Sequence, residues 1–180
     1  MLLVTLAWAA PDRVAAVLDT TSAVGDLAVS PDAAFVAFTT TAGELILFDT
    51  LSWYFWNIET PSTATHGVAL GNGYLAAGLS DGTVQIYTVD AYSGPTEWLW
   101  VDLGGTIEGL TADSTYFYVA YSVEESNPTV QGFSFESGES TGEGTTLAPS
   151  GFEQIGARLM ARGTGDAGET LGGEASDLSV

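Results

Sequence analysis

Few side chains in this sequence have the types and spacing that catalysis requires. Histidine occurs once, as His66, with the hydroxyl of Thr65 beside it. A histidine acts as a general base only when it can reach a nucleophile and when a carboxylate orients its ring. Adjacency to a threonine supplies neither condition. We therefore expect His66 to be structural, bonding a loop carbonyl.

Carboxylates are abundant, and a suitably spaced pair could hydrolyse a glycosidic bond. Several fall in predicted turns, where solvation or turn capping explains them: Asp32, Asp81, Asp90 and Asp113. The sequence contains no Asp-x-Asp-x-Asp-Gly calcium loop, and cysteine is absent, which removes thiol nucleophiles and thiolate metal sites. We expect no catalytic, cofactor-binding or metal-binding residue, and a protein that is not an enzyme.

Aromatic side chains give the best binding hypothesis. Trp53 and Phe55 are two residues apart, as are Trp98 and Trp100, so a strand at either place puts both rings on one face. On an outer strand, such faces suit protein contact or stacking against a sugar. The alternative is that they pack between neighbouring sheets.

A second candidate surface lies near the C-terminus. Ser150 and Glu153 have the spacing of a capping box, which predicts a short amphipathic helix over residues 150–163. Its apolar and arginine side chains would dock in a groove on an acidic neighbour or fold back onto the chain. They are Phe152, Ile155, Arg158, Leu159, Met160 and Arg162.

The charge balance is extreme. The 180 residues include 23 acidic ones and only three basic ones, all arginine, for a net charge of -20, yet 46% of the residues are hydrophobic. At molar salt the Debye length falls to about 3 Å, so such a surface does not repel itself. We expect a protein of a halophilic system; an acidic surface in ordinary salt is the alternative. Nucleic acid is not expected as a partner, because phosphate contacts need clustered Lys and Arg. A sialidase-like site is excluded because it needs an arginine cluster.

A repeat shows which elements must position these residues. Short apolar runs bounded by turns recur 39 residues apart, matching Phe35 to Tyr74, Gly43 to Gly82 and Phe48 to Tyr87. A period of about 40 residues made of short strands is typical of a β-propeller blade. A divergent third copy aligns 118–121 with 35–38 and 130–133 with 84–87.

Residues 25–135 resemble WD-repeat and related β-propeller blades. The resemblance lies in the turn Ser30-Pro31-Asp32, in Asp81-Gly82-Thr83-Val84 before the third strand, and in Phe48-Asp49, which stands where that family has a Trp-Asp pair. It implies an all-β fold of four-stranded antiparallel blades. It implies no particular activity.

The blades are few. Three are counted, plus an N-terminal half-blade made of Leu2–Trp8 and Val14–Asp19, whereas closed propellers usually have four to eight. Unclosed strand edges invite pairing with another chain, so we expect identical copies or another protein as partners. Closure as a small four-bladed ring is the alternative.

These patterns predict four regions: a propeller-like domain over 1–135, a Gly/Ser/Thr/Glu linker over 136–149, the helix over 150–163, and a flexible or partner-ordered tail over 164–180. We expect neither a signal peptide nor a membrane-inserting segment. By elimination, the sequence favours a non-enzymatic subunit of a larger assembly, such as a virion tail, fibre or capsid-associated component, or a surface component. A carbohydrate-binding or carbohydrate-acting propeller, with a glycan as ligand, is the alternative.

Overall fold

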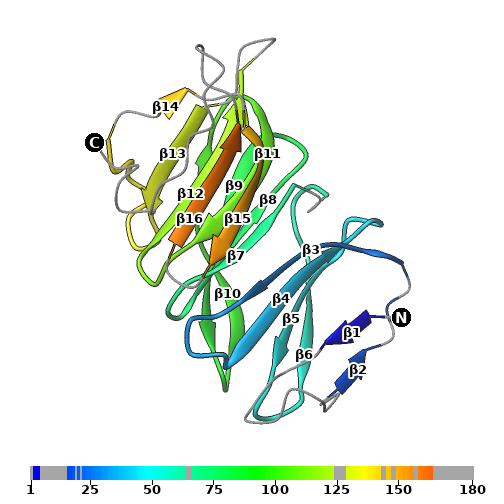
Figure 1. The fold of residues 1–180 in the computed structure, drawn as a ribbon. Helices are drawn as coiled ribbons and strands as arrows, with labels where there is room; N and C mark the ends of the chain where they lie inside the picture. Colours follow the sequence, from blue (N-terminus) through cyan, green and yellow to red (C-terminus); the bar gives the residue numbers. More distant parts are fainter. Residues whose placement is uncertain are drawn as a thin grey trace.

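The body of the molecule consists of three antiparallel sheets that lie side by side (Figure 1). The computed structural model describes residues 2–4, 16–18, 20, 22–63, 66–123, 129–142, 145–146, 149–155 and 158–163, with side chains for 20, 22–63, 66–123 and 129–142. All regular structure in these ranges is β-strand, and the expected all-β fold of four-stranded units is confirmed. No helix within the described ranges is long and apolar enough to cross a membrane.

Each sheet is an up-and-down meander, which we call a blade. Blade 1 contains β3 (Val24–Val29), β4 (Phe35–Thr40), β5 (Leu45–Asp49) and β6 (Phe55–Ile58). Blade 2 contains β7 (Val68–Leu70), β8 (Tyr74–Gly78), β9 (Thr83–Asp90) and β10 (Gly94–Asp102). Blade 3 contains β11 (Thr106–Ala112), β12 (Tyr116–Ser122), β13 (Thr129–Ser134) and β14 (Thr145–Thr146).

The 39-residue repeat is visible in the turns. Gly43 and Gly82 precede the third strands of blades 1 and 2 with φ values of 84° and 86°. This left-handed conformation is accessible to glycine without the steric cost that a Cβ would bring. The same backbone requirement therefore explains why both copies have glycine there.

Successive side chains of each strand point to opposite faces of its blade. We call the face toward the preceding blade the leading face, and the face toward the following blade the trailing face. The trailing face of blade 1 and the leading face of blade 2 form one apolar core, made of Ala28, Ala37, Leu45, Leu47, Ile58, Val68, Leu70, Leu75, Ala77, Leu79, Tyr87 and Val89. Blades 2 and 3 form a second, made of Ala69, Ala76, Val84, Ile86, Ile107, Leu110, Ala112, Phe117, Val119, Phe133 and Phe135.

Strand register corrects part of the third-copy alignment. Phe117 pairs with Phe133, as Leu75 pairs with Tyr87 in blade 2, so the alignment of 130–133 with 84–87 is right. The same pairing makes Tyr116 the counterpart of Tyr74, so the expected start of this strand at 118 was two residues too late. A divergent sequence at constant side-chain alternation leaves such a two-residue shift undetected.

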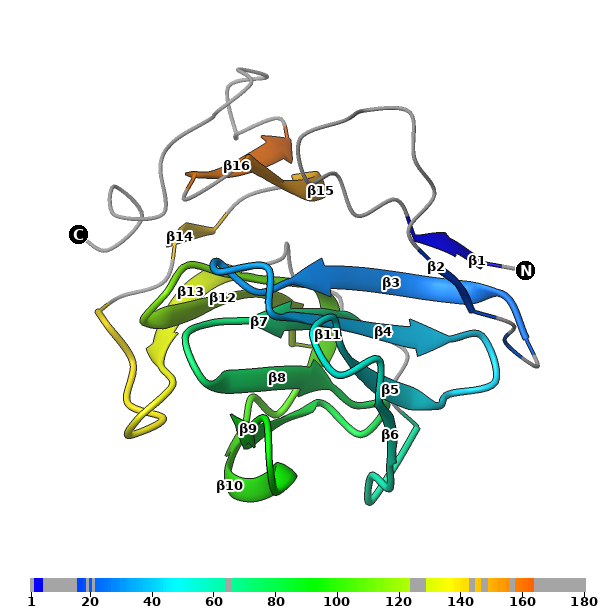
Figure 2. The ribbon, with the colours of Figure 1, turned by 90° about the horizontal axis from the view of Figure 1, so that it is seen from below.

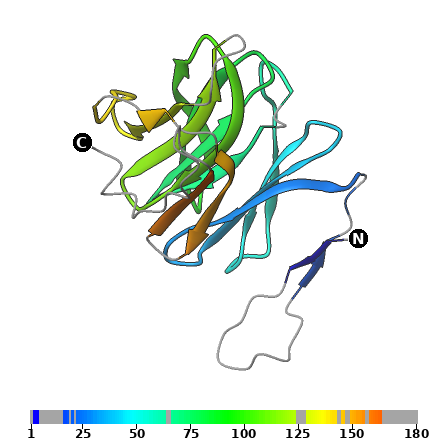
Figure 3. The ribbon, with the colours of Figure 1, turned by 45° about the horizontal axis from the view of Figure 1, so that its top comes forward.

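The N-terminal strand pair is present. β1 (Leu2–Val4) and β2 (Ala16–Leu18) form a separate two-stranded antiparallel sheet, which lies away from the blades (Figure 3). This confirms the two antiparallel strands that were expected there, although the remainder of both predicted strands lies outside the described residues.

The helix expected over 150–163 is wrong. β15 (Pro149–Ile155) and β16 (Arg158–Gly163) pair as an antiparallel hairpin, and β15 lies against β11 (Figures 1 and 2). Gly151 and Gly156 weaken the predicted helix, because glycine is a poor helix former.

Part of the expected linker belongs to blade 3. Residues 139–142 run back along β13, where the Thr141 N–H donates to the Gly132 carbonyl (2.9 Å) and Phe133 bridges to Ser140. Blade 3 thus continues past the expected boundary at 135, to β14. The predicted tail, 164–180, lies outside the described residues.

Candidate interaction surfaces and a polar pocket

The aromatic candidates of blade 1 lie on its leading face. Phe55 is in β6 and pairs with Phe48 of β5. Trp53 lies in the preceding turn with φ 62°, and its ring meets Phe48 edge-on, with ring centroids 6.2 Å apart. Tyr54 instead contacts Trp56 edge-on at 4.9 Å. The structure therefore gathers Trp53 and Phe55 around Phe48, although β6 begins only at Phe55.

This leading face is apolar and partly uncovered. Val36, Phe38 and Phe48 are buried in it, whereas Leu27 and Val29 at its inner side are 41% and 42% exposed. Phe55 at its outer side is 58% exposed. No described four-stranded sheet packs on this face, and sequence reasoning had not singled out its inner half.

The repeat relates this face to a buried face of blade 2. Val29, Val36 and Phe48 lie 39 residues before Val68, Leu75 and Tyr87, which pack against blade 1 as the leading face of blade 2. The 39-residue offset could have identified the face from sequence alone.

Trp98 and Trp100 do not share a face. The register of β10 shifts between Glu97 and Leu99, and this bulge breaks the alternation on which the prediction depended. Trp100 pairs with Gln85, on the side toward blade 1. The Trp98 indole instead donates to the Glu136 carbonyl of blade 3 (3.0 Å). Both rings are more than half exposed, so they remain separate candidates for contact.

The C-terminal candidates are distributed over the two strands of the β15–β16 hairpin, with Phe152 paired to Ala161, Glu153 to Met160, Gln154 to Leu159, Ile155 to Arg158 and Gly151 to Arg162. The single helical face that was expected to unite them therefore does not form.

His66 lies just before β7 and is half-buried; its backbone N–H donates to the Gly78 carbonyl (3.3 Å). Thr65 lies outside the described residues. Among the residues with described side chains, no group of three or more histidine or acidic residues is placed to hold a metal ion.

The four singled-out aspartates cap turns, as expected. Asp32 accepts from the Ser30 hydroxyl (2.6 Å), and Asp81 from the Thr83 N–H (3.0 Å). Asp90 accepts from the N–H of Tyr92 (2.8 Å), and Asp113 from that of Tyr116 (2.8 Å). The Ser30 hydroxyl and the Ala34 N–H hold the pKa of Asp32 below its ordinary value. The N–H groups of Ser93 and Tyr92 do the same for the pKa of Asp90, so both carboxyls stay ionised at neutral pH.

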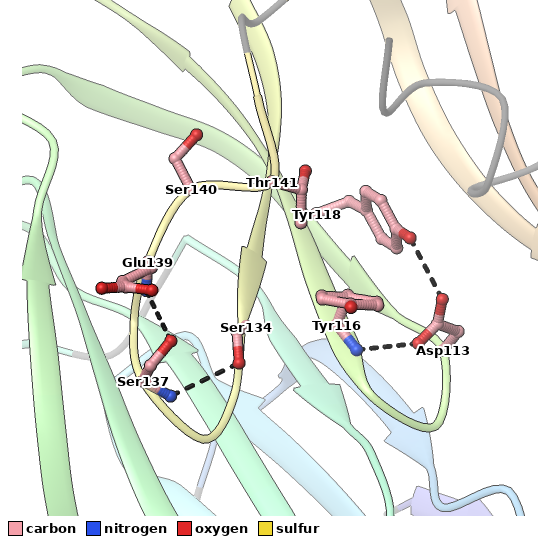
Figure 4. A pocket seen from close by; sticks show the side chains of 8 residues that line it. All are labelled: Asp113, Tyr116, Tyr118, Ser134, Ser137, Glu139, Ser140 and Thr141. Atoms are coloured by element: carbon pink, nitrogen blue, oxygen red, sulfur yellow. Dashed lines mark hydrogen bonds between the residues drawn. The ribbon is translucent and has the colours of Figure 1, made fainter.

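A polar pocket of about 540 Å³ lies on the trailing face of blade 3 (Figure 4). Sequence reasoning missed it, apart from Asp113 as a turn residue. Its lining combines hydroxyls, two carboxylates and two phenol rings: Asp113, Tyr116, Tyr118, Ser134, Ser137, Glu139, Ser140 and Thr141.

One wall of the pocket is held by Asp113. One carboxylate oxygen accepts from the N–H groups of Thr115 (2.7 Å) and Tyr116 (2.8 Å), and the other accepts from the Tyr118 hydroxyl (3.1 Å). Burial and the adjacent Asp113 charge raise the pKa of Tyr118 above its ordinary value, so the phenol keeps the proton that it donates. The carboxylate is thereby oriented before any ligand arrives.

The opposite wall is the turn after β13. The Ser134 hydroxyl accepts from the N–H groups of Glu136 (3.2 Å) and Ser137 (3.3 Å), and the Ser137 hydroxyl accepts from that of Glu139 (3.2 Å). The Gly138 N–H closes the turn on the Ser134 carbonyl (2.8 Å). Hydroxyl groups thus fix the backbone that presents Glu139 and Ser140.

Comparison with known proteins identifies the fold. No protein-family model matches the chain, and no curated protein sequence matches it. Among solved structures, the chain is similar to the computationally designed Ika4 protein, with TM-score 0.61 and 13% identity over 87% of this chain and 94% of that one. It is also similar to the β-propeller domain of Cps50 (Swd1) from Myceliophteria thermophila, with TM-score 0.56 and 12% identity over 81% of this chain. The match spans 50% of that propeller chain. At these identities the likeness shows a propeller-like fold.

Proposed function

We propose that this chain is a non-enzymatic protein-interaction module that acts as a subunit of a larger assembly. The observation that carries the proposal is the leading face of blade 1. It repeats the pattern that blade 2 buries against its neighbour, yet its rim of Leu27, Val29 and Phe55 is 41–58% exposed.

An apolar sheet face of this kind is stabilised by cover. Each Å² of apolar surface removed from water stabilises the bound state by about 25 cal/mol. Contiguous exposed apolar patches mark interaction sites. Because the equivalent face of blade 2 is covered by a β-sheet, we infer that the partner presents an apolar β-sheet face. Trp53 beside Phe48 extends the contact area outward with an aromatic ring.

The composition supports a setting for this assembly. We propose that it works at high salt, because a net charge of -20 needs strong screening before copies or partners can approach closely. We further propose a virion or surface component of a halophilic system. This rests on the combination of an interaction surface with a sequence that lacks cysteine and any recognisable catalytic motif.

Light scattering in 0.1 M and 3 M KCl tests the proposal. We expect a mass above the 18.7 kDa of one chain at 3 M KCl, decreasing as salt is lowered. Val29→Asp should abolish the larger species by placing a charge in the apolar face. Tyr92→Asp is the matched control, because Tyr92 is 99% exposed at the β9–β10 turn. A folded, soluble monomer in both salts contradicts the proposal.

A further inference from the structure

The trailing face of blade 3 departs from the repeat. One residue pair between the second and third strands faces the following blade at the same position in every blade. The pair is Ala37 with Leu47 in blade 1, Ala76 with Ile86 in blade 2, and Tyr118 with Gly132 in blade 3. In blades 1 and 2 these residues lie in the apolar cores between blades.

The substitution pattern creates the pocket. Gly132 lets two lining residues pack close to β13, because a Cβ there would lie only 2.7 Å from the Thr141 hydroxyl and 3.0 Å from the Tyr118 ring. Tyr118 brings a hydroxyl, which Asp113 binds (3.1 Å). A neighbouring position changes from Ala28 and Ala69 to Thr111, which pairs with Tyr118. Part of an apolar packing face has become hydroxyl-rich, while Ala120 and Val130 stay buried on the same face.

The charges of the lining restrict the ligand. Asp113 and Glu139 are both acidic, and none of the eight lining residues is basic, so a phosphate, sulfate or carboxylate ligand would be repelled. The carboxylates accept hydrogen bonds, which suits the hydroxyls of a polyol. The Ser140 and Thr141 hydroxyls already donate to the carbonyls of Gly142 and Gly132, so toward a ligand they act as acceptors. Tyr116, 38% exposed, offers a ring at the edge of the pocket. A volume of about 540 Å³ is that of a small-ligand site.

From this arrangement we propose that the pocket on the trailing face of blade 3 binds a neutral saccharide. Its hydroxyls donate to Asp113 and Glu139, and one of its apolar faces stacks on Tyr116. The hydrogen bonds that fix Asp113 and the 134–139 turn reduce the ordering cost of binding. This site is independent of the assembly surface on blade 1.

A glycan array in 3 M KCl, followed by titration of the best neutral glycan with NMR detection, tests the proposal on the full chain. We expect binding by a neutral glycan, with amide shifts concentrated in residues 113–118 and 134–141. Tyr116→Ala and Glu139→Gln should each weaken binding about tenfold or more, a loss of about 1.4 kcal/mol. Tyr116→Phe is the matched control and should retain binding, because it keeps the ring.

Three results would overturn the proposal that this pocket binds a neutral saccharide. They are no neutral glycan bound by the parent protein, binding unchanged in Tyr116→Ala and Glu139→Gln, or binding lost in Trp53→Ala, which lies on blade 1, outside the pocket. Spermidine serves as a cationic probe. If spermidine shifts the amide signals of the pocket and neutral glycans do not, the pocket is a cation site instead. Neutral-glycan affinity should change little between 0.5 M and 3 M KCl, whereas screening would weaken spermidine binding. Assembly measured by light scattering is a separate readout, so either proposal can fail alone.

Discussion

The leading face of blade 1 and the trailing face of blade 3 carry different kinds of side chain, although the strand order is the same in both blades. The leading face of blade 1 keeps the apolar residues of the repeat, with Val36 and Phe48 where blade 2 has Leu75 and Tyr87. The trailing face of blade 3 has Tyr118 and Gly132 where the trailing faces of blades 1 and 2 have apolar pairs, and it carries a hydroxyl-lined pocket. The leading face of blade 1 therefore has an exposed apolar rim, whereas the trailing face of blade 3 has a polar pocket beside buried residues such as Tyr118 and Val130.

This difference teaches that the strand framework and the chemistry of its faces are set separately. The order of the four strands is the same in all three blades, because alternate side chains can change without altering the backbone hydrogen bonds between strands. Changes at a few trailing-face positions suffice to convert packing surface into a polar pocket. Four experiments test how the leading face of blade 1 and the trailing face of blade 3 differ.

The largest effect is expected from removing the centre of the apolar face. Phe48→Ala deletes a ring that is fully buried under Trp53 and between neighbouring strands, and should lower the free energy of unfolding by about 3–5 kcal/mol. Denaturant titration in 3 M KCl measures this. Phe55→Ala, on the same face but 58% exposed, should cost less than about 1 kcal/mol. Equal losses of unfolding free energy in the two variants would contradict the idea that a residue's contribution on this face depends on its burial.

Restoring the repeat on the polar face should make the two outermost faces alike. The double variant Tyr118→Ala/Gly132→Ile installs the residues of blade 2 and should shift the light-scattering mass upward relative to the parent chain. Tyr118→Ala alone leaves Gly132 in place and is the control. We expect a change in unfolding free energy of about 1–3 kcal/mol, since the pocket walls must repack. If the double variant assembles like the parent, the apolar pattern does not drive association.

The interface between blades 1 and 2 offers an internal reference. The Tyr87 hydroxyl is buried there and has no hydrogen-bond partner among the described residues. Burial, followed by the charge of Glu97, raises the pKa of Tyr87 to about 12. Since the folded-state pKa lies above the ordinary value of 10.0, stability is full below pH 10 and falls as pH rises from about 10 to about 12.

Tyr87→Phe should therefore raise stability at pH 7 by up to about 1 kcal/mol, because it removes an unsatisfied polar group, and should flatten the alkaline decrease. Urea titrations from pH 7 to pH 12 measure both effects. Phe48 and Phe133 already occupy the equivalent positions of blades 1 and 3, so the substitution is sterically precedented. A loss of stability would mean that the hydroxyl has a role in this interface.

The smallest effect concerns a turn that belongs to neither outermost face. Burial acts to raise the pKa of Asp49, but hydrogen bonds from the Ser52 hydroxyl (2.7 Å) and the Leu51 N–H (2.8 Å) outweigh it and leave the pKa below its ordinary value of 3.8. The resulting stability is present above about pH 4 and is lost as pH falls through the folded-state pKa. Asp49→Asn should cost less than about 1 kcal/mol at pH 7 and reduce the acid sensitivity. Melting temperatures from pH 2 to pH 7 check this, and an unchanged acid slope contradicts it.

Sequence patterns predicted the blades where the repeat is regular. Turn glycines and alternating apolar residues located blades 1 and 2, because those constraints are local. The C-terminal hairpin was missed because Ser150 and Glu153 imitate a helix start, while strand pairing across Gly156 and Ala157 depends on partners along the chain. The bulge at Trp98 was equally invisible, since nothing in the local alternation marks it. The pocket is formed by residues of two chain segments, 113–118 and 134–141, which only the register of blade 3 brings together.

The turn aspartates have a consequence for how such a protein can evolve. Six aspartates each accept a hydrogen bond from a backbone N–H within a turn: Asp32, Asp49, Asp81, Asp90, Asp102 and Asp113. Part of the negative charge of the protein therefore also stabilises its turns. Asparagine retains one such acceptor oxygen without the charge. A lineage moving between waters of different salinity could therefore exchange aspartate for asparagine turn by turn. It would retune its solubility while the course of the backbone stays the same.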